Sequence, residues 1–115
     1  MEVDEQKLIQ SILHGDTERY RYFMQKYGTQ VLALIVRIVK DRQDAEELTQ
    51  DVFVKVFNAL SDFRGEASFR TWLMRIAYNT AQSYLRKHKL EIINLKDDEQ
   101  FSESENDKNL DNEEK

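Results

Sequence analysis

Cationic and amide side chains recur along one face of the helix predicted from residue 69 to residue 88. At about 100° per residue, a polar stripe on this helix holds Thr71, Arg75, Gln82 and Arg86, with Asn79 at its edge. Trp72 and Tyr78 flank the stripe, and Lys87 follows it near the helix end. Guanidinium and amide groups at this spacing, next to aromatic rings, suit a surface that holds phosphates and stacks on unpaired bases.

The charge of this part of the sequence favours the nucleic-acid interpretation over a merely solvated helix face. Basic residues late in a helix are common in any protein, because the helix dipole favours them there. From Arg64 to Lys89, however, six basic residues stand against one acid, Glu66, whereas the whole chain has a net charge of −5. A basic patch of opposite sign to the rest of the chain is typical of a nucleic-acid surface.

A second candidate surface lies on the helix predicted from Ala45 to Leu60. Its apolar stripe faces the core, and the opposite face is formed by Glu47, Gln50, Asp51, Val54 and Asn58. This outer face could be an ordinary solvated surface with a stray valine. An apolar centre with an acidic rim also suits docking to a basic partner. Since residues 41–62 hold six acids and two bases, two neighbouring helices of opposite charge indicate two different partners.

No pattern in the sequence predicts an enzyme. His14 and His88 each lie at a predicted helix end, far apart in the chain, and the sequence has no glycine-rich phosphate loop. The chain has no cysteine, which excludes a disulfide or a thiolate metal site. We therefore expect no catalytic residues, no metal and no cofactor. Because no apolar run approaches the ~18 residues of a membrane span and the N-terminus is acidic, we expect a cytoplasmic protein without a membrane partner.

The predicted fold class is all-α, a compact bundle of about four helices. The chain lacks proline and has three glycines, Gly15, Gly28 and Gly65, each placed where a helix could end or bend. Helices are predicted over residues 5–14, 17–39, 45–60 and 69–88, with Asp16 as one cap and Asp41 or Asp44 as another. The pattern leaves open whether Gly28 breaks the second helix or is tolerated inside it.

The predicted domain organisation has two parts. Residues 1–90 form one helical domain with a modest core. Residues 91–115 hold ten acids and three bases, with Phe101 as the only aromatic residue. This composition cannot bury enough apolar surface to offset the ordering of the chain. We therefore expect an acidic, disordered linker or tail from residue 91 onward.

Two long segments, DAEELTQDVFVKVFNAL and FRGEASFRTWLMRIAYNTAQSYLRK, resemble the second conserved region of bacterial sigma factors, and most of all the extracytoplasmic-function group. The resemblance extends more loosely back to Asp16 and covers most of residues 5–90. It implies an all-helical domain that binds the clamp helices of the largest RNA polymerase subunit. It also implies recognition and melting of the minus-ten promoter element, and an anti-sigma factor as a further partner.

The resemblance also assigns roles to residues. The polymerase-binding positions are Glu47, Gln50 and Asp51, with Val54 on the same face. Loop 63–68 and the following helix correspond to the part that holds a flipped non-template base, where Phe63 would stack on the base and Asn79 would read its edge. The expected DNA-binding set is Phe63, Ser68, Phe69, Arg75, Asn79, Gln82, Arg86 and Lys87, with Ala67 nearby. For Trp72 a buried core position is favoured over a role as a base wedge.

One departure from the family pattern and two alternatives accompany this interpretation. Family members carry a second, helix-turn-helix domain that reads the minus-thirty-five element, and this chain is expected to lack it, ending within what resembles the linker. One alternative is a helical adaptor for a basic protein, or a protein-binding domain regulated by an anti-sigma factor, in either case without DNA recognition. The other is a general nucleic-acid-binding domain without sequence preference.

Overall fold

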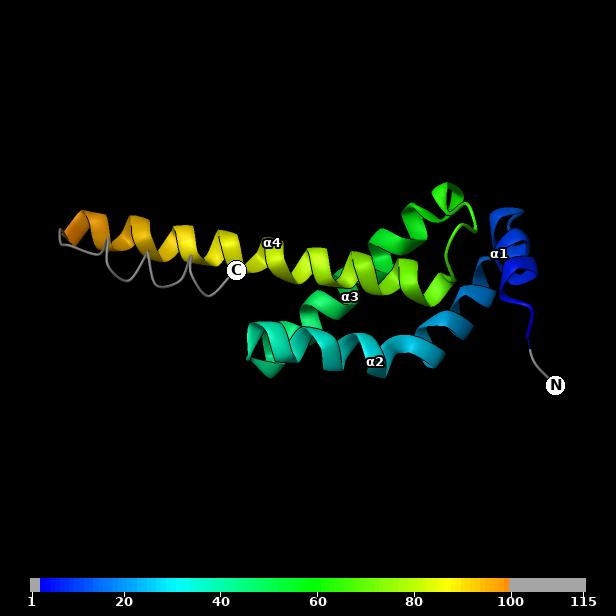
Figure 1. Cartoon of the computed structure of the whole chain (residues 1–115), viewed down its shortest axis with the longest axis horizontal. Helices are drawn as coiled ribbons and strands as arrows, with labels where there is room; N and C mark the ends of the chain where they lie inside the picture. Colours follow the sequence, from blue (N-terminus) through cyan, green and yellow to red (C-terminus); the bar gives the residue numbers. More distant parts are fainter. Residues whose placement is uncertain (1–2, 100–115) are drawn as a thin grey trace. The chain divides into compact units, whose positions relative to one another are not determined.

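Helices make up all the regular structure of residues 3–99, which are the residues that the computed structural model describes (Figure 1). In chain order these are α1 (Glu5–Leu13), η1 (Thr17–Tyr20), α2 (Arg21–Val39), α3 (Arg42–Asn58), η2 (Leu60–Asp62) and α4 (Phe69–Glu99), where η marks a short 3₁₀ helix. Four α-helices and no strand within this range confirm the predicted all-α class. The chain divides into two units, Met1–Gln82 and Ser83–Lys115.

The helix ends follow from local capping chemistry. The Asp4 carboxylate accepts from the amides of Gln6 and Lys7 at the start of α1, and Asp41 accepts from the Asp44 amide at 2.9 Å at the start of α3. Gly15 follows α1 with φ +117°, which confirms it as the residue after the helix end.

The structure answers two questions about the second helix, namely how it begins after Asp16 and whether Gly28 interrupts it. Asp16 does not cap a helix through its side chain but pairs with Arg19 at 2.6 Å, and a 3₁₀ helix follows it. Gly28 lies inside α2, which is one helix from Arg21 to Val39.

The core of the first unit is built from α1, α2, α3, η2 and the part of α4 that belongs to this unit. Its largest fully buried side chains are Phe23, Val31, Ile35, Val52, Val56, Leu60 and Leu73. The Tyr20 hydroxyl donates to the Phe53 carbonyl at 2.6 Å, which joins the end of η1 to α3. Leu13 and Met24, which fall on the apolar faces of their helices by helical spacing, are 43% and 41% exposed. They lie at the edges of their apolar stripes, beyond the part that the neighbouring helices cover.

Helix α4 continues to Glu99, past residue 88 where the sequence analysis ended it. No glycine or proline follows Gly65 to interrupt the helix. Residues 91–99, expected in the tail, are therefore helical. Residues 100–115 lie outside the described range, and their disorder stays a prediction. Within residues 3–99, no helix combines the length and apolarity needed to cross a membrane.

Candidate nucleic-acid interface

The loop of residues 63–68 connects η2 to α4 and has a defined local structure. Gly65 has φ +75°, a backbone conformation that residues other than glycine rarely adopt. The Ser68 hydroxyl accepts from the Thr71 amide at 3.1 Å and donates to the Thr71 hydroxyl at 3.0 Å. Ser68 therefore acts as an N-terminal cap for α4, which fixes the direction in which the loop enters the helix.

A pocket of about 230 Å³ opens between this loop and the first turns of α4, and we call it the loop pocket. Its lining residues are Asp62, Phe63, Arg64, Glu66, Ala67, Trp72 and Arg75. The rings of Phe63 and Trp72 lie with their centroids 5.0 Å apart and form an aromatic wall. This volume is below the ~300–1,000 Å³ typical of sites for drug-sized ligands, so the pocket suits one planar group with polar edges.

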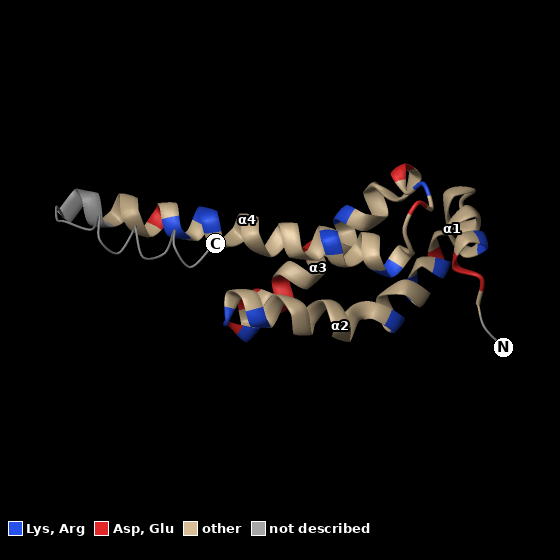
Figure 2. Cartoon of the chain, viewed as in Figure 1, with Lys and Arg blue, Asp and Glu red and all other residues tan. Residues whose placement is uncertain are grey.

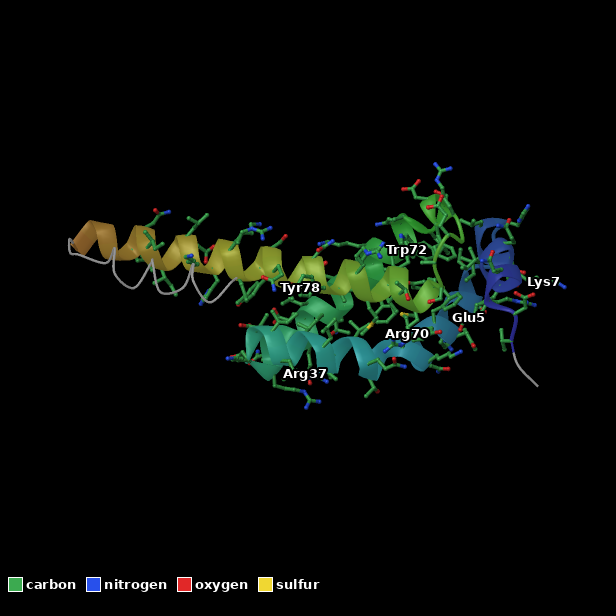
Figure 3. All side chains as sticks on the ribbon, viewed as in Figure 1. Glu5, Lys7, Arg37, Arg70, Trp72 and Tyr78 are labelled. Carbon is green, nitrogen blue, oxygen red and sulfur yellow. The ribbon has the colours of Figure 1, made fainter. Side chains whose placement is uncertain are left out.

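The expected DNA-binding residues of the first unit divide between this pocket and other positions. Phe63 and Arg75 line the loop pocket, as does Ala67, whereas Ser68 and Asn79 do not. Asn79 and the neighbouring Tyr78 are exposed on α4, and Figure 3 shows Tyr78 on this helix, away from Trp72. Arg75 and Asn79 are four residues apart, so their side chains lie on the same helix face.

The expected role of Phe69 as a DNA contact is wrong, because Phe69 is a core residue. It is 3% exposed, and its ring packs on Phe23 with centroids 4.2 Å apart. A ring enclosed in the core cannot stack on DNA, so Phe69 is not a direct contact. It instead supports the aromatic wall from the core side, with centroids 6.0 Å from Phe63 and 5.9 Å from Trp72.

Other pocket residues were missed by the sequence analysis. Trp72, expected to be buried in the core, is only partly buried and lines the loop pocket. Its position on the border between the polar and apolar stripes was the available signal. Asp62, Arg64 and Glu66 could not be found this way, because side-chain directions in a loop follow no helical period.

Basic residues of α4 differ in how far they are engaged within the protein. From Phe69 to Leu90 the helix carries no acid, which Figure 2 shows as blue and tan along this part of the ribbon. Arg70 donates to the Gln30 side chain of α2 at 2.7 Å and so contributes to helix packing. Of the expected DNA contacts on this part of α4, Arg75 is exposed, whereas the uncharged Gln82 is partly buried.

The second unit carries the remaining two expected DNA contacts. Arg86 and Lys87 are both exposed. The Arg86 guanidinium donates to the Ser83 hydroxyl at 3.2 Å, and the Tyr84 ring stacks on His88 at 5.7 Å. Exposed cations at these positions are available to phosphates.

The predicted polymerase-binding face is also exposed and borders a groove. Glu47, Gln50 and Asp51 are exposed on α3, and Val54 is 59% exposed. A groove of about 440 Å³ runs between α2 and α3, and we call it the α2–α3 groove. Its lining residues are Tyr20, Met24, Gly28, Thr49, Gln50, Phe53, Val54 and Phe57. Exposed apolar side chains with an acidic rim are typical of a protein-binding surface.

Comparison with known proteins gives consistent matches. Residues 23–91 match the family model for sigma-70 region 2. The chain is 42% identical over 81 residues to the RNA polymerase sigma-H factor of Pseudomonas aeruginosa, covering 70% of this chain and 42% of that protein. It is 36% identical over 84 residues to the ECF RNA polymerase sigma-E factor of Escherichia coli, covering 73% of this chain and 44% of that protein. The chain thus spans less than half the length of these curated relatives.

A solved structure matches the fold as well. It is an NMR structure of an engineered region 2 of sigmaE in complex with GTAAAA, and it has 32% sequence identity to this chain. The TM-score is 0.69, and the match covers 76% of this chain and 90% of that one.

Proposed function

Because the chain belongs to the sigma-70 region 2 family and to its extracytoplasmic-function group, we propose that it binds RNA polymerase core and captures one unpaired base of the minus-ten promoter strand. The base occupies the loop pocket. The observation that carries the proposal is the aromatic wall of Phe63 and Trp72 beside the Arg75 side chain in one pocket of about 230 Å³. Such a protein contributes to transcription initiation by binding, without a catalytic site of its own.

The energetics of base capture fit this pocket. Extruding a base from a duplex costs a few kcal/mol, and stacking on an aromatic side chain returns ~1–3 kcal/mol per base. Phe63 and Trp72 supply the stacking surface. The guanidinium groups of Arg64 and Arg75 can donate hydrogen bonds to a bound base, and the carboxylates of Asp62 and Glu66 can accept hydrogen bonds from it. A pocket with both donors and acceptors can distinguish one base edge from another.

In the first unit, the exposed face of α4 is proposed to hold the strand that leads from the pocket. Asn79 lies one helical turn beyond Arg75, where its amide can read a base edge. Gln82 follows on the same polar stripe. In the second unit, Arg86 and Lys87 are proposed to contact phosphates, because both are exposed cations. Ser68 serves this surface indirectly, by fixing the start of α4.

The acidic face of α3 and the α2–α3 groove are proposed as the polymerase-binding surface. The partner is the pair of clamp helices in the largest polymerase subunit. Exposed Val54, Met24 and Phe57 provide apolar contact area at 59%, 41% and 37% exposure. Glu47 and Asp51 give this surface its charge and therefore select a basic partner.

The proposed regulator is an anti-sigma factor that covers the same surfaces. The proposed location of the protein is the cytoplasm.

The test of this function measures sequence preference as well as affinity. Single-stranded DNA containing GTAAAA, variants of it altered at single positions and a scrambled strand are titrated against the chain. We expect discrimination at the position whose base enters the loop pocket, and we expect Phe63→Ala to remove the discrimination at that position. The general nucleic-acid binder predicts equal affinity for all strands, and the adaptor predicts no DNA binding. A pull-down with isolated clamp helices tests polymerase binding separately. A chain that binds polymerase captures the clamp helices, and an adaptor for another basic protein does not.

A further inference from the structure

Helix α1 lies outside the segment 23–91 that matches the family model, yet it reaches the loop that forms the loop pocket. A Cβ placed on Gly65 would lie 2.9 Å from the Gln6 side-chain nitrogen and 3.5 Å from its oxygen. The amide of Gln6 therefore packs directly on the backbone of the loop at Gly65. Helix α1 also packs against η2, the turn that leads into the loop.

Glu5 fixes α1 on α2 through a network of charged and hydroxyl groups. Its carboxylate accepts from the Lys26 ammonium at 2.8 Å, from the Tyr27 hydroxyl at 2.9 and 3.1 Å, and from the Tyr22 hydroxyl at 3.2 Å. The Glu5 side chain is only 18% exposed. The Lys26 ammonium lies 5.5 Å and 5.3 Å from the centres of the Tyr22 and Tyr27 rings. Charge-assisted hydrogen bonds such as these are stronger than hydrogen bonds between neutral groups.

A chain of aromatic contacts continues from this network to the loop pocket. The Tyr27 ring packs on Phe69, with centroids 5.8 Å apart. Phe69 packs in turn on both rings of the aromatic wall, Phe63 and Trp72. Glu5 thus holds a tyrosine that supports the residue behind the wall, while Gln6 holds the loop itself. In Figure 3, Glu5 lies on the α2 side of α1, whereas Lys7 points outward.

We propose that α1 is a positioning element for the loop pocket, with Glu5 and Gln6 as positioning residues that set which base the pocket accepts. This inference rests on the proposed function of the pocket. Neither residue touches the bound base. Each acts by holding a part of the pocket in place, because a recognition pocket must keep its donors and stacking surfaces in a fixed geometry.

The first test needs no DNA and reads the pocket directly. Trp72 is the only tryptophan in the chain and lines the loop pocket, so its fluorescence reports on the wall. Acrylamide quenching and the emission maximum are measured for the full chain and for Glu5→Gln, Gln6→Ala and the control Lys7→Ala, which alters an exposed α1 side chain. Relative to the unaltered chain, we expect quenching to increase in the first two variants and to stay the same in the control, at unchanged helix content. Unchanged quenching in both Glu5→Gln and Gln6→Ala overturns the proposal.

The second test measures base discrimination with the same variants. The probes are the GTAAAA strand, its single-position variants and a scrambled strand. We expect Glu5→Gln and Gln6→Ala to lower discrimination at the pocket position about fivefold, at the low end of couplings between separate sites. Their affinity for the scrambled strand should stay near that of the unaltered chain, and Lys7→Ala should change neither quantity. Retained discrimination in both variants contradicts the positioning role.

The two tests separate this inference from the proposed function. If the unaltered chain discriminates at no position, base capture by the pocket fails. The fluorescence result then still decides whether α1 holds the pocket wall.

Discussion

The rings of Phe63 and Trp72 meet with their centroids 5.0 Å apart, although one residue lies in the loop after η2 and the other in the first turns of α4. Phe69 packs on both from the core. The wall of the loop pocket is therefore continuous with the hydrophobic core. A rigid stacking surface at the edge of a core loses little conformational freedom when a base binds, which favours recognition by shape.

Two glycine-to-alanine substitutions should have opposite effects on stability. Gly65 has φ +75° and Gln6 against its Cα, so alanine there should lower the free energy of unfolding by about 1 kcal/mol or more. Gly28 lies inside α2, and an added Cβ meets nothing within 4 Å. Alanine at position 28 should therefore raise stability by about 1 kcal/mol. Urea denaturation measures both, and a stabilising Gly65→Ala would contradict the strained loop.

The contrast between these glycines also shows what the sequence could predict. Helical periodicity located most of the core faces, and the sequence offered Asp41 or Asp44 as the cap of α3, because both features depend on residues close in the chain. The structure selects Asp41. Helical periodicity could not decide whether Gly28 broke a helix, since that depends on the packing of Val31 and Ile35 beyond it. Nor could it foresee that Gln6 packs on Gly65, a contact between distant segments. The polar stripe on α4 was predictable, but the burial of Phe69 depends on Phe23 of another helix.

Tyr20 should make stability depend on pH at the alkaline end. Burial raises the pKa of Tyr20 above its ordinary value of 10.0. The stabilisation from its neutral hydroxyl is therefore complete below about pH 10 and is lost as the pH rises toward the folded-state pKa. Tyr20→Phe should cost about 1 kcal/mol at neutral pH, because the Phe53 carbonyl loses its donor. It should also reduce the loss of stability above about pH 10.

The control for this prediction is Tyr78→Phe, since Tyr78 is 49% exposed and should affect neither quantity. Burial, and then its bond to Glu5, raise the pKa of Tyr27 as well. The alkaline slope should therefore shrink in Tyr20→Phe without disappearing. Denaturation curves at several alkaline pH values give the slope. An unchanged slope would show that Tyr20 is not the titrating group.

Reversal of charge on the acidic face of α3 should weaken polymerase binding. Asp51 is exposed and points away from the buried stripe of α3, so Asp51→Lys should leave the fold intact. Its affinity for isolated clamp helices should fall. The fall should be larger at low salt, because added salt screens the interaction between the charges. Glu91→Lys applies the same charge change outside α3 and should have little effect. Unaltered clamp-helix affinity in folded Asp51→Lys would reject the assignment of this face.

Filling the α2–α3 groove should have the same effect without any change of charge. Gly28 lines the groove and has open space around it, so the side chain in Gly28→Leu can occupy the groove without disturbing the core. We expect weaker clamp-helix binding at equal or higher thermal stability. Gly28→Ala, which adds one carbon, is the matched control and should bind nearly as well as the unaltered chain. Equal affinity of both variants would show that the partner does not enter the groove.

Asn79 and Arg86 should separate specificity from affinity. Asn79→Ala should lose discrimination at one minus-ten position by about 1–3 kcal/mol, the value of a bidentate base contact, with little change for scrambled single strands. Arg86→Ala should weaken all sequences alike and lower the salt dependence by about one charge. The measurement is made with the chain assembled on RNA polymerase core, on templates altered at single minus-ten positions. If Asn79→Ala weakens every template equally, Asn79 holds the backbone, and base reading must come from the polar groups of the loop pocket.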